Sequence, residues 1–148
     1  MELILWRHAE AEDGFPDMAR VLTPKGHKQA QHMAAWLKPR LPQGTRILVS
    51  PARRTQQTAA ALGVDFSTLQ ELAPDATPEA VLAAAGWPDH ADSALIVGHQ
   101  PTLGEVAALL LDSATPSLST RKGAIWWFAV RRGEVALKAM LPPELLER

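Results

Sequence analysis

The hydrophobic positions of this chain fall into short continuous runs that polar or turn-forming residues interrupt. The first run, Leu3–Trp6, ends abruptly at Arg7. Runs of this length, with such boundaries, are typical of buried strands. A weaker alternation follows the turn at 131–133 and predicts the second arm of a hairpin. Strands are therefore expected at 3–6, 46–49, 64–66, 94–97, 124–130 and 134–140.

Between these runs, apolar residues recur with helical spacing. Ala30, Met33, Ala34 and Leu37 follow the i, i+3, i+4, i+7 rule. The preceding Thr-Pro pair at 23–24 supplies an N-cap hydroxyl and a proline suited to the first helical position. Similar starts, with Ser50 and Thr77 as N-caps and Pro101 as a first helical residue, predict further helices. Helices are expected at 24–38, 51–62, 78–85 and 101–110.

The order of these elements predicts an α/β fold with a largely parallel sheet. Strands that are apolar throughout and alternate with helices are usually covered on both faces. The length of 148 residues suits a single domain over 1–148. Segments 9–22 and 112–123 are rich in turn-forming residues and are expected to be loops. The tail at 142–146 is expected to be loosely held.

Composition narrows the classes of protein that the chain can belong to. A content of 47% hydrophobic and 21% charged residues predicts a globular chain, and the net charge of −1 gives no general attraction to nucleic acid or membrane. The absence of cysteine excludes disulfides, thiolate zinc sites and cysteine nucleophiles. The run at 3–6 is too short for a signal peptide or a membrane span. We therefore expect a cytoplasmic protein.

The candidate chemistry lies where strands end. Arg7 and His8 directly follow the first strand, and His99 follows the strand at 94–97. Ligands of parallel sheets bind at the carboxyl ends of the strands. Arg54 lies in the first turn of a predicted helix, where the dipole disfavours a cation and a bound phosphate would explain it. Each residue alone could be an ordinary surface or structural residue, but two strand-end histidines favour a shared site.

Several other kinds of site are not indicated. The chain contains no Gly-x-Ser-x-Gly elbow, no Walker loop and no Gly-x-Gly-x-x-Gly. His27 and His32 are five residues apart, a spacing that does not bring two metal ligands onto one helix face. His8-x-Glu10 is shared with zinc deaminases, whose cysteine ligands are missing here. The remaining constellation is suited to phosphoryl transfer, in which fixed cations stabilise the phosphoryl oxygens. It consists of Arg7, His8, Arg54 and His99, with Arg20 as a fifth candidate.

Four segments together carry a family resemblance: Leu5–Glu10, Arg20–Gly26, Val49–Ala59 and Ile96–Pro101. In this order and at these separations they resemble the histidine phosphatase superfamily, and within it the short SixA-type protein-histidine phosphatases. The resemblance covers nearly the full length. It implies a phosphoglycerate-mutase-like fold, a three-layer α/β/α sandwich with a mostly parallel central sheet and one antiparallel C-terminal hairpin.

The same resemblance implies a role for each matching residue. His8 would be the nucleophile that becomes phosphohistidine. Arg7 and Arg54 would bind the phosphoryl oxygens, and His99 would donate to the phosphoryl group in the transition state. Arg20 would border the phosphate pocket. No metal and no cofactor is implied, because the fixed arginines supply the positive charge.

One departure from the family pattern concerns the general acid. Many members carry Asp or Glu directly after the second histidine, where this chain has Gln100. Glu10, Glu71 and Asp75 stay open as candidates. A weak or absent acid suits a phosphoramidate such as phosphohistidine, because imidazole leaves more readily than an alkoxide. The chain is also too short for the cap insertions of larger relatives, which favours an open site.

Three functions remain open. The first is a phosphatase that acts, as a monomer, on phosphohistidine of a histidine-phosphotransfer or similar carrier domain. The second is a small-molecule phosphomonoesterase with the same site, and the third is an inactive phosphate-binding module. The presence of the core site residues favours an enzyme. Arg121 and Lys122, before the final hairpin, could contact the substrate or belong to a solvated loop.

Overall fold

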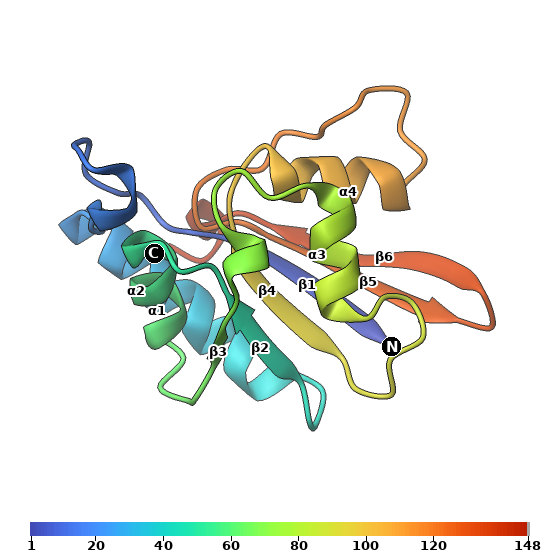
Figure 1. The fold of residues 1–148 in the computed structure, drawn as a ribbon. Helices are drawn as coiled ribbons and strands as arrows, with labels where there is room; N and C mark the ends of the chain where they lie inside the picture. The colour runs from blue at the N-terminus through green and yellow to red at the C-terminus, as the bar shows by residue number, and fades with distance from the viewer. Residues whose placement is uncertain (148) are drawn as a thin grey trace.

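A six-stranded sheet forms the centre of the molecule (Figure 1), and the computed structural model describes residues 1–147. The strand order is β3-β2-β4-β1-β5-β6. The first four strands in this order are parallel, whereas β5 runs antiparallel to β1 and β6 antiparallel to β5. The mostly parallel sheet with an antiparallel C-terminal hairpin is thus confirmed. The strands are β1 Glu2–Arg7, β2 Arg46–Val49, β3 Ser67–Thr68, β4 Ala94–Gly98, β5 Ile125–Arg131 and β6 Glu134–Leu141.

Helices cover both faces of the sheet and give the three expected layers (Figure 1). On one face, side chains of α1 and α2 pack with Ile4 and Trp6. On the other, side chains of α3 and α4 pack with Leu3 and Leu5. Successive residues of β1 therefore serve opposite core clusters, as the pleat of a strand requires. The helices are α1 Pro24–Leu37, α2 Arg53–Ala60, α3 Pro78–Ala85 and α4 Thr102–Leu110, with short 3-10 helices at Asp17–Ala19, Lys38–Arg40, Gln70–Leu72 and Pro143–Leu145.

Two of the predicted helix starts form as their sequences indicate. The Thr23 hydroxyl accepts a hydrogen bond from the Gly26 N–H at 2.9 Å, and Thr77 caps α3 in the same way. α3 ends at Gly86, whose φ of 71° lies in the left-handed region that glycine adopts without strain. No helix within residues 1–147 has the length and apolar character that a membrane crossing requires.

Other local predictions are wrong. Ser50 does not cap α2, because the helix begins at Arg53 and its N-cap residue is Ala52, without a side-chain cap. The third strand lies at 67–68 rather than 64–66, where its backbone can pair with β2. α4 begins one residue after Pro101. The C-terminal tail is not loose: Pro143 is buried, and a 3-10 helix forms there.

The sheet register brings the predicted site residues to one edge. Arg7 of β1 is opposite Gly98 of β4, and Val49 of β2 is opposite Val97. The next residue of each parallel strand therefore lies at the same carboxyl edge. The His8 N–H extends the ladder by donating to the Gly98 carbonyl at 3.1 Å. This edge is where parallel α/β sheets bind their ligands.

Candidate active site

His8 is buried at the end of β1, with 6% of its surface exposed. Its Nδ1 lies 2.8 Å from the carbonyl oxygen of Ala9. Because a carbonyl only accepts, Nδ1 carries the hydrogen and Nε2 keeps a lone pair. Burial, and then the positive charges of Arg54 and Arg7, lower the pKa of His8 to about 4. The imidazole is therefore neutral, and its Nε2 nucleophilic, at physiological pH.

His99 faces His8, with the two ring centroids 5.4 Å apart and the rings inclined by 54°. Its Nε2 lies 2.7 Å from the hydroxyl oxygen of Ser50. The same hydroxyl accepts from the Ala52 N–H at 3.2 Å. Arg54 Nη2 approaches the other ring nitrogen, Nδ1, to 3.4 Å, which makes Nδ1 the acceptor and gives Nε2 the hydrogen. Burial and the adjoining His8 and Arg54 lower the pKa of His99 to about 3.

Arg7 and Arg54 lie close enough to His8 and His99 for their charges to lower the pKa of both imidazoles. The side chain of Arg54 is buried, with 5% of its surface exposed. Its guanidinium donates from Nη1 to the backbone oxygen of Asp17 at 2.9 Å and from Nη2 to the Asp17 carboxylate at 3.2 Å. Arg7 donates from Nη1 to the Thr120 carbonyl at 2.8 Å. The Nε atoms of both arginines are buried without a partner among the described residues. Burial and the charge of Arg54 lower the pKa of Arg7, so an anion placed between them would relieve their repulsion.

Arg20 reaches this site only through a carboxylate. Its Nη1 donates to Asp17 Oδ1 at 3.0 Å, and its Nε donates to the Glu12 carbonyl at 2.8 Å. Asp17 thus bridges Arg20 and Arg54, and its hydrogen bonds to these two cations lower its pKa. The charge of Arg20 adds a small effect to the lowered pKa of His8. Arg20 is therefore at the border of the site.

Asp17 and Ser50 are absent from the set of residues predicted from the sequence. Asp17 lies in a turn-rich loop whose carboxylates carry no periodic signal. Ser50 precedes a proline, a pattern that predicts a helix cap, and only the sheet register reveals that it faces His99. The sequence signal that could have identified Ser50 as a site residue is the Ser-Pro-x-x-Arg spacing, which links Ser50 to Arg54.

None of the three candidate acids forms a hydrogen bond with His8 or His99 within residues 1–147. Glu71 and Asp75 are exposed in the segment that precedes α3. Glu10 is partly buried, and its carboxylate accepts from the Thr23 hydroxyl at 2.7 Å.

Gln100, where many family members have an acid, has a structural role. Its amide donates to the Leu118 carbonyl at 2.8 Å and accepts from the Gly104 N–H at 2.9 Å. Through these two hydrogen bonds, the Gln100 side chain connects the loop that precedes β5 to the start of α4. No group of three metal-ligating side chains is found within the described part of the chain.

The arrangement is chemically suited to phosphoryl transfer. A neutral imidazole with a free Nε2 faces a second imidazole, and two fixed guanidinium groups lie beside them. Donors that are held in place before reaction stabilise the charge that develops on phosphoryl oxygens. A histidine can take up the phosphoryl group covalently and split one difficult step into two.

Comparisons with known proteins agree with this chemistry. The family model of the histidine phosphatase superfamily (branch 1) matches residues 3–75. Phosphohistidine phosphatase SixA of Escherichia coli is 32% identical over an alignment of 130 positions, which covers 81% of this chain and 80% of that protein. A phosphohistidine phosphatase SixA homolog of Haemophilus influenzae is 34% identical over 78% of this chain and 80% of its own length.

Solved structures show the same architecture. The structure of protein histidine phosphatase SixA complexed with tungstate superposes with a TM-score of 0.81 and 28% identity, over 99% of this chain and 100% of that one. A phosphoserine phosphatase mutant of Entamoeba histolytica shares the fold at a TM-score of 0.76, with 17% identity over 99% of both chains. The phosphoglycerate-mutase-like fold is thus confirmed. From the sequence match and the fold together, the chain belongs to the histidine phosphatase superfamily.

Proposed function

We propose that this protein hydrolyses phosphohistidine on a protein substrate, through a covalent phosphohistidine intermediate on His8. The observation that carries the proposal is the pair of buried, neutral imidazoles 5.4 Å apart, with two fixed arginines beside them. A neutral His8 provides the lone pair, and Arg7 and Arg54 provide the positive charge. Two histidines that served only to pack the core would not need two neighbouring arginines whose buried Nε atoms have no partner among the described residues.

In the first step, Nε2 of His8 attacks the phosphorus of the substrate. A nitrogen–phosphorus bond to His8 forms while the bond from phosphorus to the substrate imidazole breaks. The departing imidazole takes a proton from solvent and leaves neutral. Arg7 and Arg54 hold the equatorial oxygens, and His99, when protonated at Nδ1, donates to one of them.

In the second step, water attacks the phosphorus on His8. The new phosphorus–oxygen bond replaces the bond to Nε2, one proton of water is released, and inorganic phosphate leaves. His8 returns to its neutral form, with Nδ1 still donating to Ala9. No metal is needed in either step, because the charge on the phosphoryl oxygens is met by the two arginines.

Two considerations support a protein-borne phosphoramidate over an alkyl phosphate. Imidazole is a better leaving group than an alkoxide, and no carboxyl group hydrogen-bonds to the paired histidines among the described residues. The Escherichia coli relative is also a phosphohistidine phosphatase. A histidine-phosphotransfer or similar carrier domain is the proposed substrate, and the proposed working form is a monomer in the cytoplasm.

The test compares phosphate release from a phosphohistidine-bearing carrier protein with release from a panel of small phosphate esters. Wild type is assayed beside His8→Ala and beside His32→Ala, which removes an exposed histidine of α1 as the matched control. We expect release from the carrier, its loss in His8→Ala only, and no effect of EDTA.

Brief reaction with radiolabelled carrier should also leave an alkali-stable, acid-labile label on wild type and none on His8→Ala. Release from esters alone would favour the small-molecule phosphatase. Loss of activity with EDTA, or activity that survives His8→Ala, would refute the covalent mechanism.

A further inference from the structure

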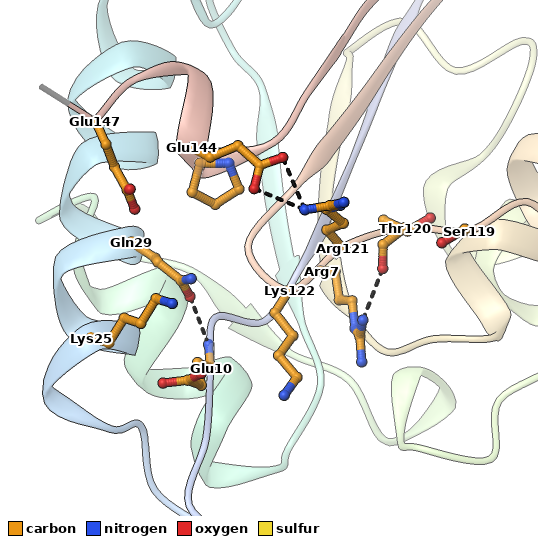
Figure 2. A pocket seen from close by; sticks show the side chains of 11 residues that line it. Arg7, Glu10, Lys25, Gln29, Ser119, Thr120, Arg121, Lys122, Glu144 and Glu147 are labelled. Atoms are coloured by element: carbon orange, nitrogen blue, oxygen red, sulfur yellow. Dashed lines mark hydrogen bonds and ion pairs between the residues drawn. The ribbon is translucent and has the colours of Figure 1, made fainter.

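Arg7 also lines a pocket at the end of β1 (Figure 2). Its volume is about 440 Å³. The walls come from the segment after β1, the first turns of α1, the residues before β5 and the C-terminal 3-10 helix. Because Arg7 belongs to both this pocket and the active site, a group bound here lies next to the phosphoryl group on His8.

Charges are distributed unevenly within this pocket. Arg121 forms an ion pair with Glu144 at 2.9 Å, which neutralises both at one end. In contrast, neither Lys25 nor Lys122 forms an ion pair or a side-chain hydrogen bond with another of the described residues. Figure 2 shows Lys122 extending toward the end of the pocket at which Arg7 lies, while Glu144 lies at the opposite end. Lys122 thus places a positive charge without a partner at the end that Arg7 lines, and Lys25 places another on the α1 wall of the pocket.

Glu10 is the carboxylate at this end of the pocket, and it is already engaged. Its Oε2 accepts from the Thr23 hydroxyl at 2.7 Å, and its backbone N–H donates to the Gln29 side chain at 2.9 Å. Among residues 1–147, Arg7 forms a side-chain hydrogen bond through Nη1 alone, to the Thr120 carbonyl. Apart from the Arg121–Glu144 pair, the lining carries three cationic side chains and two carboxylates, Glu10 and Glu147, and Glu147 lies at the end where Glu144 is (Figure 2). One positive charge is left unbalanced, which gives a net attraction for a further anion.

We propose that this pocket is a second anion subsite, in which Lys25 and Lys122 bind a carboxylate of the substrate beside the phosphoryl group. The inference rests on the proposed function. For a protein substrate, the carboxylate belongs to an Asp or Glu side chain close to the phosphohistidine. The subsite selects among phosphorylated proteins by charge complementarity, which the phosphate-binding residues alone cannot do.

Binding of two non-hydrolysable probes tests the subsite without catalysis. Methylphosphonate carries one anionic group, and 3-phosphonopropionate adds a carboxylate on a short linker. Calorimetry gives the ratio of their dissociation constants for wild type, for the double variant Lys25→Ala/Lys122→Ala, and for Lys28→Ala. Lys28 is an exposed lysine one turn along α1 that does not line the pocket, and it serves as the matched control.

We expect wild type and Lys28→Ala to bind 3-phosphonopropionate at least about fivefold more tightly than methylphosphonate, the range that two exposed ion pairs give. The double variant should lower this ratio to about one to two. Added salt should also lower the wild-type ratio, because exposed pairs are screened. A wild-type ratio near one, or a ratio that the double variant leaves unchanged, would overturn the subsite.

A pair of phosphohistidine peptides identifies the source of the anion. One peptide carries Glu next to the phosphohistidine and the other Gln, and wild type should have the higher kcat/KM for the Glu peptide. The double variant should lose this preference. If wild type binds 3-phosphonopropionate more tightly than methylphosphonate but does not hydrolyse phosphohistidine, the proposed function is refuted and the subsite is kept. If wild type hydrolyses phosphohistidine but prefers neither the carboxylate probe nor the Glu peptide, the subsite is refuted and the proposed function is kept.

Discussion

Acidification should destabilise this protein in a way that can be traced to His8 and His99. In the unfolded chain an imidazole has an ordinary pKa of about 6.5, whereas burial lowers the folded values to about 4 and about 3. As the pH falls below about 6.5, the unfolded state binds protons that the folded state does not, and stability decreases until the folded pKa is reached. Above the unfolded pKa, both forms are neutral and this stabilisation is fully present.

The size of the effect follows from these values. Between about pH 7.5 and about pH 5, protonation of one unfolded imidazole with no protonation in the folded state costs about 2 kcal/mol. His8 and His99 together should therefore lower the free energy of unfolding by about 4 kcal/mol over this interval. The two rings are neighbours, so their contributions are coupled and need not add in full.

Urea unfolding at several pH values measures this loss, with fluorescence of the five tryptophans as the signal. Wild type should lose about 2 kcal/mol more between about pH 7.5 and about pH 5 than His8→Gln, which cannot take up the proton. His32→Gln, in which an exposed imidazole is replaced, should lose as much as wild type. Equal losses in wild type and His8→Gln would mean that folded His8 protonates at its ordinary pKa, and the lowering of its pKa by burial and the arginines would be refuted.

Three substitutions probe the surroundings of the site. Ser50→Ala leaves the Nε2–H of His99 without an acceptor, so it should lower the free energy of unfolding by about 1–3 kcal/mol and kcat/KM by at least about tenfold; an active variant with unchanged kcat/KM would contradict this. Asp17→Asn removes a carboxylate that competes for Arg54, so calorimetry should show orthophosphate binding about two- to fivefold more tightly; weaker binding would mean that Asp17 positions Arg54 instead. Gly26→Ala should lower the free energy of unfolding by about 1–3 kcal/mol despite the better helix propensity of alanine, because its Cβ would collide with the backbone after β1; a more stable variant in urea unfolding would contradict this.

The sequence was sufficient for the fold because its local signals agree with one another. The run at 94–97 is apolar on both faces, as a central parallel strand must be, and all of β4 is buried. Thr23 and Gly86 mark helix ends through chemistry that acts within one turn. β3 was misplaced because it consists of two exposed residues, Ser67 and Thr68, and carries no hydrophobic pattern. Only its pairing with the edge of β2 defines it.

The predicted site residues do come together, since strand ends that are distant in sequence meet at one edge of the sheet. Tertiary contacts that leave no local pattern in the sequence could not be predicted from it. Asp17 contacts Arg54 across 37 positions of the chain, and Ser50 contacts His99 across 49. The tail looked loose because its prolines do not continue a strand, but Pro143 is buried and lies in a 3-10 helix.

In the proposed mechanism, one residue type performs two tasks. Both imidazoles are buried and neutral, and the same arginine lowers the pKa of each. What separates them is the nitrogen that the fold engages. The Ala9 carbonyl holds Nδ1–H of His8 and leaves Nε2 free to attack, whereas the Ser50 hydroxyl holds Nε2–H of His99 and leaves Nδ1 facing Arg54. A phosphoryl group that enters brings negative charge to Nδ1 and raises the pKa of His99 from its low value. On this reasoning the substrate itself converts His99 from an acceptor into a donor, and His8 can stay neutral until it has attacked.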